Sequence, residues 1–416
     1  MKLCSVKNFL ETGLPFMKTA SSLPVVEYVE RRDRLAQALA IDGVDAFVVE
    51  PGYTFKYYAN VSQPEWEVWE PEERPFLMVV RPVRTQSGKV IANTTFLAPA
   101  FEAERARLLN MPFEGPISIL PWEEHWNPYQ TLYDAQLFTA KRPTIMVDEE
   151  MRDFIQRGLG KNGFNIVGLG GEVEKVRQTK SEREVGILRA VNTGTVEAIR
   201  QMRKCMYSGL TENEVMEVLD NTLRAAGMEP FFDIVLFDEN ASNPHGGTNG
   251  SKVLEEDTFV LIDVGAHLHG YSSDVCRTFF PPFLPQNDEV KNRLSHKLEI
   301  WNIVFDAQTA SMAHFKENRT AASVDIAARK VITDAGYGET FTHRVGHGIG
   351  IKAHESPYLN KGNTGSLLKA GMTFTSEPGI YLVDKFGVRH EDIFLVREEG
   401  EPDCLSCPRA TDAWTP

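Results

Sequence analysis

The chain lacks any apolar run of the roughly 18 to 20 residues that a membrane-spanning helix needs, so we expect no association with a membrane. It also lacks a basic excess. Among 416 residues, 44 are Lys or Arg and 58 are Asp or Glu, a formal net charge of -14 at pH 7. Nucleic-acid binders and proteins that bind anionic membranes present a basic face, so this balance argues against both. The acidic balance has two equally good explanations. The carboxylates serve to bind cations, or they belong to an ordinary solvated surface.

Cysteine is scarce, with five in the whole chain. An odd, small number predicts no disulfide framework and fits a reducing, cytoplasmic compartment. Cys404 and Cys407 form a single C-x-x-C near the C-terminus, with no second pair to complete a zinc site. We therefore expect two incidental thiols there instead of a redox or metal site.

Sequons for N-glycosylation weaken the cytoplasmic assignment. Five N-x-S/T sequons occur, at Asn60, Asn93, Asn240, Asn249 and Asn318. Such sequons are used in secreted proteins, so a secretory route stays open as the alternative.

Several catalytic motifs are missing. The sequence has no H-E-x-x-H and no G-x-S-x-G, which excludes the zincin and nucleophile-elbow patterns. The glycine-rich stretch HGGTNGSK lacks the G-K-[ST] order of a phosphate loop, and HGIGIKAH lacks the strand–loop–helix context of a dinucleotide fingerprint.

The length predicts two domains. After a tail to about residue 23, the first half alternates helical and strand patterns, which predicts an α/β domain over residues 24–170. Its helices are expected at 26–40 and 101–109 and its strands at 45–50, 75–83, 91–98 and 143–147. A glycine cluster at 168–171 marks the boundary.

The second half, residues 171–402, predicts an α+β domain. Two capping boxes, Ser181 with Glu184 and Thr211 with Glu214, predict the starts of two helices. Further helices are expected at 286–315 and 321–335, and strands at 233–237, 258–264, 275–280, 372–377 and 391–396.

Acidic residues adjoin the buried strands of this second half. Asp263 follows the apolar run FVLI, and Asp274 comes eleven residues later, after a turn signalled by Gly270. A strand–turn–strand would bring the two carboxylates together, where they repel unless one is protonated or a metal neutralises both. A strand-end aspartate bonded to backbone N–H groups plus an ordinary loop aspartate is the alternative, and these two residues alone do not decide.

The pattern recurs further on. Glu377 follows a strand and precedes a Pro-Gly turn, and Glu391 opens another strand. His347 lies in the sequence between the Asp263–Asp274 segment and the Glu377–Glu391 segment, among glycines. Four carboxylates and one imidazole are enough to hold two divalent cations. This oxygen-rich set suits Mn²⁺, with Co²⁺, Fe²⁺ and Zn²⁺ as alternatives.

These segments resemble the metallopeptidase family that includes methionine aminopeptidase, aminopeptidase P and prolidase. The likeness lies in DVGAHLHGYSSDVCRTF, THRVGHGIG, SEPGIY and GVRHED, and covers residues 172–400. Upstream, the opening helix of the proline-specific branch is matched by Arg177, Lys180, Ser181, Glu184 and Arg189. The first 170 residues more weakly resemble the N-terminal domain of creatinase and prolidase. The resemblance implies an α+β pita-bread catalytic domain preceded by a creatinase-like α/β domain.

The resemblance also implies a role for each metal ligand. Asp263 would bind one metal, His347 and Glu377 the other, and Asp274 and Glu391 would bridge them. Glu377 would also accept the proton of a bridging water.

Other residues near these ligands match family positions too. His245 matches a substrate-side histidine, His354 a histidine that contacts the scissile amide, and Arg389 an arginine that braces the acidic cluster. His343 and His390 are interpreted as supporting or surface histidines, and His267 and His269 as loop residues.

The implied function is a dinuclear-metal hydrolase that cleaves the peptide bond before proline, in Xaa-Pro dipeptides or at the N-termini of Xaa-Pro peptides. Non-peptidase enzymes on the same fold, of the creatinase, ectoine hydrolase or dimethylsulfoniopropionate lyase type, are the first alternative. A non-enzymatic binding module is the second. Intact ligands with His245 and His354 favour the peptidase.

We also expect a homodimer from the resemblance. The aromatic stretch over residues 53–73 includes Tyr57, Trp66 and Trp69, too many rings for a polar loop to leave unburied. We place it near the dimer interface or the active-site entrance, with packing on its own domain as the alternative.

Overall fold

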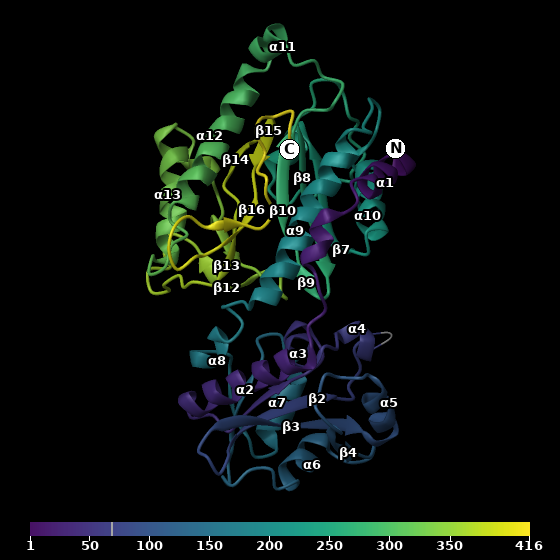
Figure 1. The fold of residues 1–416 in the computed structure, drawn as a ribbon, viewed down its shortest axis with the longest axis vertical. Coiled ribbons are helices and arrows are strands. Elements are labelled where there is room, and N and C mark those ends of the chain that lie inside the picture. Colours follow the sequence, from purple (N-terminus) through teal and green to yellow (C-terminus); the bar gives the residue numbers. More distant parts are fainter. Residues whose placement is uncertain (68–69) are drawn as a thin grey trace. The chain divides into compact units, whose positions relative to one another are not determined.

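A computed structural model describes residues 1–67 and 70–416. The chain forms two compact units (Figure 1): a small unit, Ser22–Arg177, and a large unit, Met1–Ser21 with Gln178–Pro416. Residues 171–177, which were expected to open the second domain, belong to the small unit. The reason is local, because the Asp42 carboxylate at the end of α2 accepts hydrogen bonds from the backbone N–H groups of Glu172 and Val173.

The small unit is built on a six-stranded mixed sheet. Its strands are β1 (Ala46–Val49), β2 (Leu77–Arg84), β3 (Val90–Pro99), β4 (Ser118–Trp122), β5 (Thr144–Val147) and β6 (Asn165–Val167), in the order β4-β3-β2-β1-β5-β6. The pair β1 and β5 is parallel, whereas β2 runs antiparallel to both of its neighbours. The four predicted strands are confirmed; β4 and β6, which are short and half-exposed, were not predicted.

Helices complete the small unit. They are α2 (Val25–Asp42), α3 (Tyr53–Ala59), α4 (Gln63–Trp66), α5 (Ala103–Leu108), α6 (Pro128–Asp134), α7 (Asp153–Lys161) and α8 (Gly171–Lys175). Helix α2 packs on β2 and β3. Leu132 of α6 and Ile155 and Leu159 of α7 pack with every second residue of β1 and β2, as expected for one face of a pleated sheet.

The aromatic stretch belongs to the core of this unit. Tyr57 and Trp66 are only 1% and 5% exposed. The Trp66 ring stacks on Phe76, with 3.9 Å between centroids, and the guanidinium carbon of Arg105 lies 4.6 Å from the centroid of the Trp66 ring. Trp69 lies outside the described residues. Tyr57 and Trp66 therefore pack within their own unit, which was the alternative expected from the sequence, and a role near an interface or the active-site entrance stays a prediction.

The large unit contains two antiparallel sheets and a hairpin. One sheet has β7 (Glu229–Phe237), β8 (Val260–Leu268) and β10 (Val275–Phe279) in the order β10-β8-β7, with β9 (Tyr271–Ser272) paired to β8. The other has the order β12-β11-β13-β16-β17, from β11 (Gly346–Gly348), β12 (Glu355–Leu359), β13 (Thr373–Ser376), β16 (Asp392–Leu395) and β17 (Asp403–Cys404). The hairpin is β14 (Gly379–Leu382) with β15 (Phe386–Arg389).

Helices cover the two sheets (Figure 1). Helices α9 (Glu182–Arg203) and α10 (Glu212–Ala225) pack with the first sheet, and α12 (Ser295–Met312) and α13 (Ala321–Asp334) with the second. Both predicted capping boxes are present at the starts of α9 and α10. The helix predicted over 286–315 is instead two helices, α11 (Asp288–Arg293) and α12, because Leu294 leaves the helical conformation between them. Short 3-10 turns occur at Pro15–Thr19, Ala100–Glu102, Asp238–Ser242 and Gly338–Thr340.

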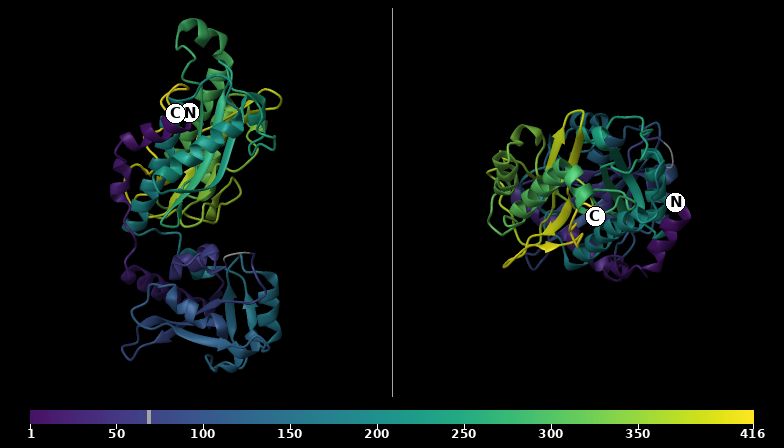
Figure 2. Two further views of the ribbon diagram at one scale, coloured as in Figure 1. Left: turned by 90° about the vertical axis from the view of Figure 1, so that its right-hand side faces the viewer. Right: turned by 90° about the horizontal axis from the view of Figure 1, so that it is seen from above.

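The first 21 residues are not the tail that the sequence predicted. Helix α1 (Lys2–Glu11) and the turn after it lie along α9 (Figures 1 and 2), with Phe9 and Phe16 buried in the core of the large unit. No helix of the described residues is both long and apolar enough to cross a membrane.

The prediction of unpaired cysteines is also wrong. Cys4 of α1 is bonded to Cys205 just after α9, and Cys404 to Cys407, while Cys276 is free and buried. The first pair is separated by 201 positions, so only the packing of α1 against α9 brings the two sulfurs together.

Candidate metal centre

Antiparallel pairing brings the predicted acidic residues of the first sheet together. Asp263 lies in β8 opposite Cys276 of β10, and Asp274 immediately precedes β10. The second sheet does the same for the glutamates, because Glu377 follows β13 and Glu391 precedes its partner β16. The two sheets meet here: the backbone N–H of Glu391 donates to the carbonyl of Cys276 at 3.0 Å.

The five predicted ligand residues converge. Ligand atoms of Asp263, Asp274 and Glu391 lie within 4.8 Å of one another, and so do those of His347, Glu377 and Glu391. A third such group joins Asp274 and His347 to His354. Asp274, His347 and Glu391 each belong to two of these groups, so the three groups form one continuous cluster.

His347 presents its free nitrogen to the acids. Its Nδ1 lies 3.0 Å from the Gly348 carbonyl, and since a carbonyl can only accept, Nδ1 carries the proton. The lone pair of Nε2 then points to Glu377 Oε1 at 3.3 Å and Asp274 Oδ2 at 3.6 Å. A backbone hydrogen bond on one ring nitrogen and a free second nitrogen is the usual arrangement of a metal-ligating histidine.

Burial and neighbouring negative charge disfavour the ionised form of three of the four carboxylates, and a bound cation would offset both effects. Burial, together with the neighbouring acids, raises the pKa of Asp274 and of Glu391 well above the ordinary range, and burial raises that of Asp263. Glu377 differs: burial opposes its ionisation, but His347, when its Nε2 also carries a proton in place of a metal ion, outweighs burial and lowers the pKa of Glu377 to about 2.

Two of these carboxylates each have one buried oxygen without a hydrogen-bond partner among the described residues. These oxygens are Asp263 Oδ1 and Glu391 Oε1. Unpaired buried carboxylate oxygens are costly unless a cation binds them. The donor set, four carboxylates and one imidazole, therefore fits divalent metal ions.

Arg389 braces the cluster through a chain of hydrogen bonds that the sequence did not predict in full. Its Nη2 donates to Asp263 Oδ2 at 2.6 Å, and its Nη1 donates to the Tyr381 hydroxyl at 2.8 Å. The Tyr381 hydroxyl then donates a hydrogen bond to His343 Nε2 at 2.7 Å. The ring proton of His343 therefore lies on Nδ1, which donates to the Arg344 carbonyl. Burial lowers the pKa of His343, consistent with this neutral form.

His343 is thus a supporting residue, one of the two interpretations made from sequence, and not a surface one. Tyr381 was missed as a functional residue. The sequence offered one hint of its role, which is its position in the motif SEPGIY near Glu377. Its hydrogen-bond partners His343 and Arg389 lie elsewhere in the sequence, so their contact with Tyr381 could not be inferred.

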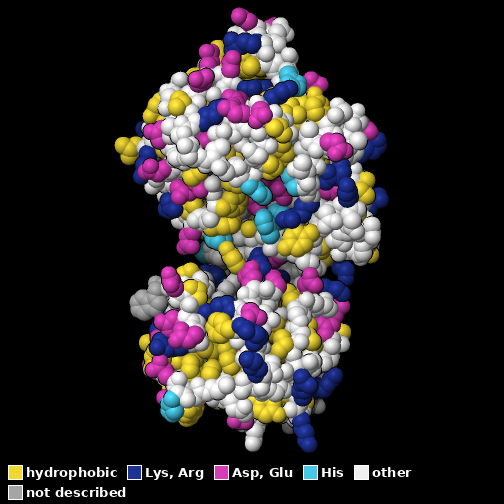
Figure 3. Space-filling model, turned by 180° about the vertical axis from the view of Figure 1, so that it is seen from behind, with side chains coloured by type: hydrophobic (Ala, Val, Ile, Leu, Met, Phe, Trp, Pro, Cys, Tyr) yellow, Lys and Arg dark blue, Asp and Glu magenta, His cyan; other side chains and the backbone are white. Residues whose placement is uncertain are grey.

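His354 and His245 lie on the open side of the cluster. The His354 side chain is 58% exposed, with Nε2 at 3.7 Å from Asp274 Oδ2 and its ring 4.1 Å from that of His347. Partial burial and the neighbouring His347 lower the pKa of His354 to about 4, which leaves it neutral at pH 7. His245 is exposed in a loop whose Pro244 carbonyl accepts from Arg389. Figure 3 shows histidine and acidic side chains gathered on one face of this unit.

The remaining histidines singled out from sequence lie outside the three groups. His390 is buried against Trp301, with 4.5 Å between ring centroids. His267 was interpreted as a loop residue, but it lies within β8, paired with Glu229 of β7, and stacks on Phe231. His269 occupies the left-handed turn between β8 and β9, as expected. None of the three contributes to the clusters described above.

Comparisons with known proteins relate the chain to a metallopeptidase family. The sequence model of metallopeptidase family M24 matches residues 186–398. An uncharacterized peptidase of Schizosaccharomyces pombe is 40% identical over 419 aligned positions, which cover 99% of this chain and 88% of that protein. A solved dipeptidase of Mycobacterium ulcerans is 27% identical with a TM-score of 0.80, covering 95% of this chain and 99% of that one. A solved Xaa-Pro dipeptidase of Bacillus anthracis is 26% identical with a TM-score of 0.73, covering 92% of this chain and 98% of that one.

Proposed function

The chain belongs to metallopeptidase family M24, and from that premise we propose that it is a dinuclear-metal Xaa-Pro peptidase. It would hydrolyse the bond before proline in Xaa-Pro dipeptides or at the N-termini of longer peptides. The observation that carries the proposal is the set of five convergent side chains with two unpartnered buried carboxylate oxygens. The proline preference is supported by the likeness to an Xaa-Pro dipeptidase over almost the whole chain.

Five residues would hold the two ions, most suitably Mn²⁺: Asp263, Asp274, His347, Glu377 and Glu391. Bound ions would supply a water of lowered pKa and would polarise the peptide carbonyl.

Side chains of the protein would transfer the proton, contact the substrate and orient a ligand. The Glu377 carboxylate would take up the proton of the attacking water, and the neutral imidazole of His354 would donate a hydrogen bond to the substrate. Arg389 keeps Asp263 oriented through the 2.6 Å bond to Oδ2. His245, exposed beside that arginine, would contact the substrate.

The experiment compares proline and non-proline peptides. Protein stripped with a chelator and reloaded with Mn²⁺ is assayed on Ala-Pro, Ala-Pro-Ala, Ala-Ala and Ala-Ala-Ala. We expect cleavage of at least one proline peptide, loss of this activity in the stripped protein, and much weaker cleavage of the alanine controls.

Which proline peptide is cleaved separates a dipeptidase from an aminopeptidase. Equal cleavage of Ala-Pro and Ala-Ala would remove the proline specificity. Metal-loaded protein that cleaves none of the four would favour the non-peptidase alternative on the same fold.

The homodimer is likewise a proposal, as is a peptide substrate with proline in second position. Sedimentation velocity on the purified protein tests the first directly: a single species at the monomer mass of 46.8 kDa would reject it.

A further inference from the structure

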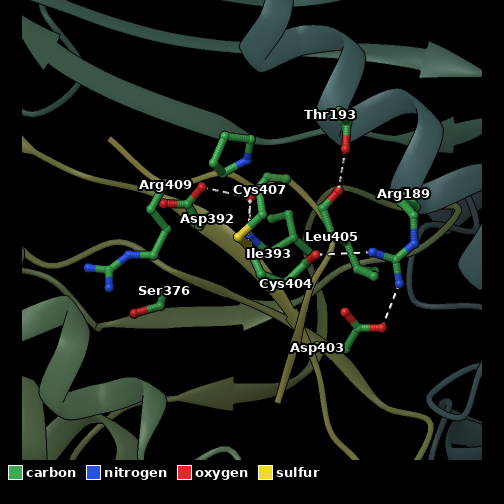
Figure 4. Close-up of a disulfide and its surroundings, with 12 residues drawn as sticks. Arg189, Thr193, Ser376, Asp392, Ile393, Asp403, Cys404, Leu405, Cys407 and Arg409 are labelled. Carbon is green, nitrogen blue, oxygen red and sulfur yellow. Dashed lines mark hydrogen bonds and ion pairs between the residues drawn. A yellow bond between two sulfur atoms is a disulfide. The ribbon is translucent and has the colours of Figure 1, made fainter. Parts of the chain in front are cut away.

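A short loop closed by a disulfide lies beside β16, the strand that begins directly after Glu391 (Figure 4). Cys404 ends β17, where it pairs with Phe394 of β16, and its bond to Cys407 closes the loop around Leu405 and Ser406. Ser406 is fully buried, whereas both cysteines are half-buried and so within reach of a reductant.

The loop reaches the metal centre through Ser406. The Ser406 hydroxyl accepts from the backbone N–H of Ile393 at 3.0 Å and donates to Asp392 Oδ1 at 2.7 Å. Asp392 directly follows the proposed ligand Glu391. Both are held by Arg277, which donates to the Glu391 carbonyl and to Asp392 Oδ1, each at 2.6 Å.

A second connection starts at Arg409, two residues beyond the disulfide. Its Nε donates to Gln308 Oε1 at 2.7 Å, which orients the amide so that Nε2 donates to Asp392 Oδ2 at 3.1 Å and to the Ser376 carbonyl at 3.0 Å. Ser376 immediately precedes the proposed ligand Glu377. The segment therefore bonds directly to Asp392, which follows Glu391, and reaches Ser376, which precedes Glu377, through Gln308.

We propose that residues 404–409, here called the disulfide brace, position Glu391 and Glu377 for metal binding, and that opening the Cys404–Cys407 disulfide weakens metal affinity. Buried hydrogen-bond networks around metal ligands set ligand orientation, and losing one partner commonly lowers metal affinity 10- to 100-fold. The inference rests on the proposed function only for the identity of the ligands.

The chemistry needs a named reductant. A dithiol attacks one sulfur of the Cys404–Cys407 bond, and its second thiol then resolves the mixed disulfide. The products are two protein thiols and one oxidised dithiol, so two electrons and two protons pass from the reductant to the protein.

The test isolates this disulfide. In the Cys4→Ser/Cys205→Ser variant, Cys404–Cys407 is the remaining bond, and Cys276 is a buried thiol. This protein is reduced with a dithiol, freed of reductant anaerobically, and titrated with Mn²⁺ by calorimetry beside its oxidised form. We expect the Kd to rise about tenfold or more on reduction and to recover on reoxidation. Circular dichroism checks that both forms are folded at the titration temperature.

Single substitutions separate positioning from general stability. Ser406→Ala should raise the Kd for Mn²⁺ about tenfold. Thr193→Val is the matched control, because the Thr193 hydroxyl donates to the Leu405 carbonyl of the same loop and, within the described part of the chain, does not bond to Asp392. It should lower thermal stability while leaving the Kd unchanged.

The outcomes are distinguishable from failure of the proposed function. If unmodified protein binds no Mn²⁺, the proposed metal centre is wrong, and the proposed role of the disulfide brace is rejected as well. If oxidised protein binds Mn²⁺ and the reduced form and Ser406→Ala bind it equally well, the brace alone is overturned, whatever peptide is cleaved. An equal loss of affinity in Thr193→Val would also overturn it, since the effect would then be a general loosening of the loop.

Discussion

Asp263 and Arg389, 126 positions apart, form a buried ion pair with 2.6 Å between Oδ2 and Nη2. The pair joins β8 to the end of β15 and turns the other oxygen of Asp263 away from its arginine. That oxygen, Oδ1, has no partner among the described residues. One side of the carboxylate is thus fixed by the protein, and the other is left for a ligand.

Metal binding should stabilise the fold. The four clustered carboxylates disfavour one another's ionised forms, and an ion that binds only the folded state adds about 2.7 kcal/mol at a concentration of 100 Kd. We expect a clear fall in Tm when chelator replaces Mn²⁺ in differential scanning calorimetry at pH 7. His347→Ala, which lacks one ligand, serves as the control and should respond less. Identical Tm values for stripped and loaded protein would contradict the metal centre.

His354 and His347 should separate catalysis from metal binding. His354→Ala should keep both ions and lose roughly 10² to 10⁴ in kcat, the range for a lost proton-transfer or oxyanion group. His347→Ala should lose metal, because Nε2 faces Glu377 and Asp274. Metal analysis of the two variants beside their kinetics decides between the roles. Equal metal loss would mean that His354 is a ligand.

Trp66 should matter for stability and not for metal content. Its ring is buried against Phe76, so Trp66→Ala should cost about 3 to 5 kcal/mol in the free energy of unfolding. Trp126, which is 50% exposed, is the matched control, and its replacement by Ala should change stability by less than about 0.5 kcal/mol. Urea denaturation measures both. A stable Trp66→Ala protein whose subunits dissociate would instead assign this ring to an interface.

Asp148 should make the small unit less stable as the pH rises. Burial, and then its neighbour Glu149, raise the pKa of Asp148 to about 7, while Thr54 donates to its Oδ1 at 2.9 Å. The folded state therefore binds a proton more tightly than the unfolded state. Stability that is present below the unfolded-state pKa, about 4, is lost progressively up to about pH 7.

Asp148→Asn removes this titration and keeps an oxygen for Thr54. It should flatten the stability profile between pH 4 and 7 and exceed the unmodified protein in stability above pH 7. Glu104→Gln, at an exposed position, is the control and should follow the unmodified profile. A slope unchanged by Asp148→Asn would refute the assignment.

Local signals account for the elements that were predicted correctly. A capping box needs only a residue and its third neighbour, so Ser181 with Glu184 and Thr211 with Glu214 marked two helix starts. Apolar runs marked the strands beside Asp263 and Glu391. Where the local signal was weak, as in the partly exposed β4 and β6, the strand was not predicted.

By itself the sequence determined which residues are suited to a metal centre, because an acid that adjoins a buried strand is a feature of a few consecutive positions. It also carried the family resemblance, since that lies in short motifs. Only the tertiary structure decided that the N-terminal helix packs on α9, that four cysteines are paired, and that Tyr381 links His343 to Arg389. Those contacts join segments distant along the chain, and their distances depend on how sheets and helices pack, which no local pattern of residues records.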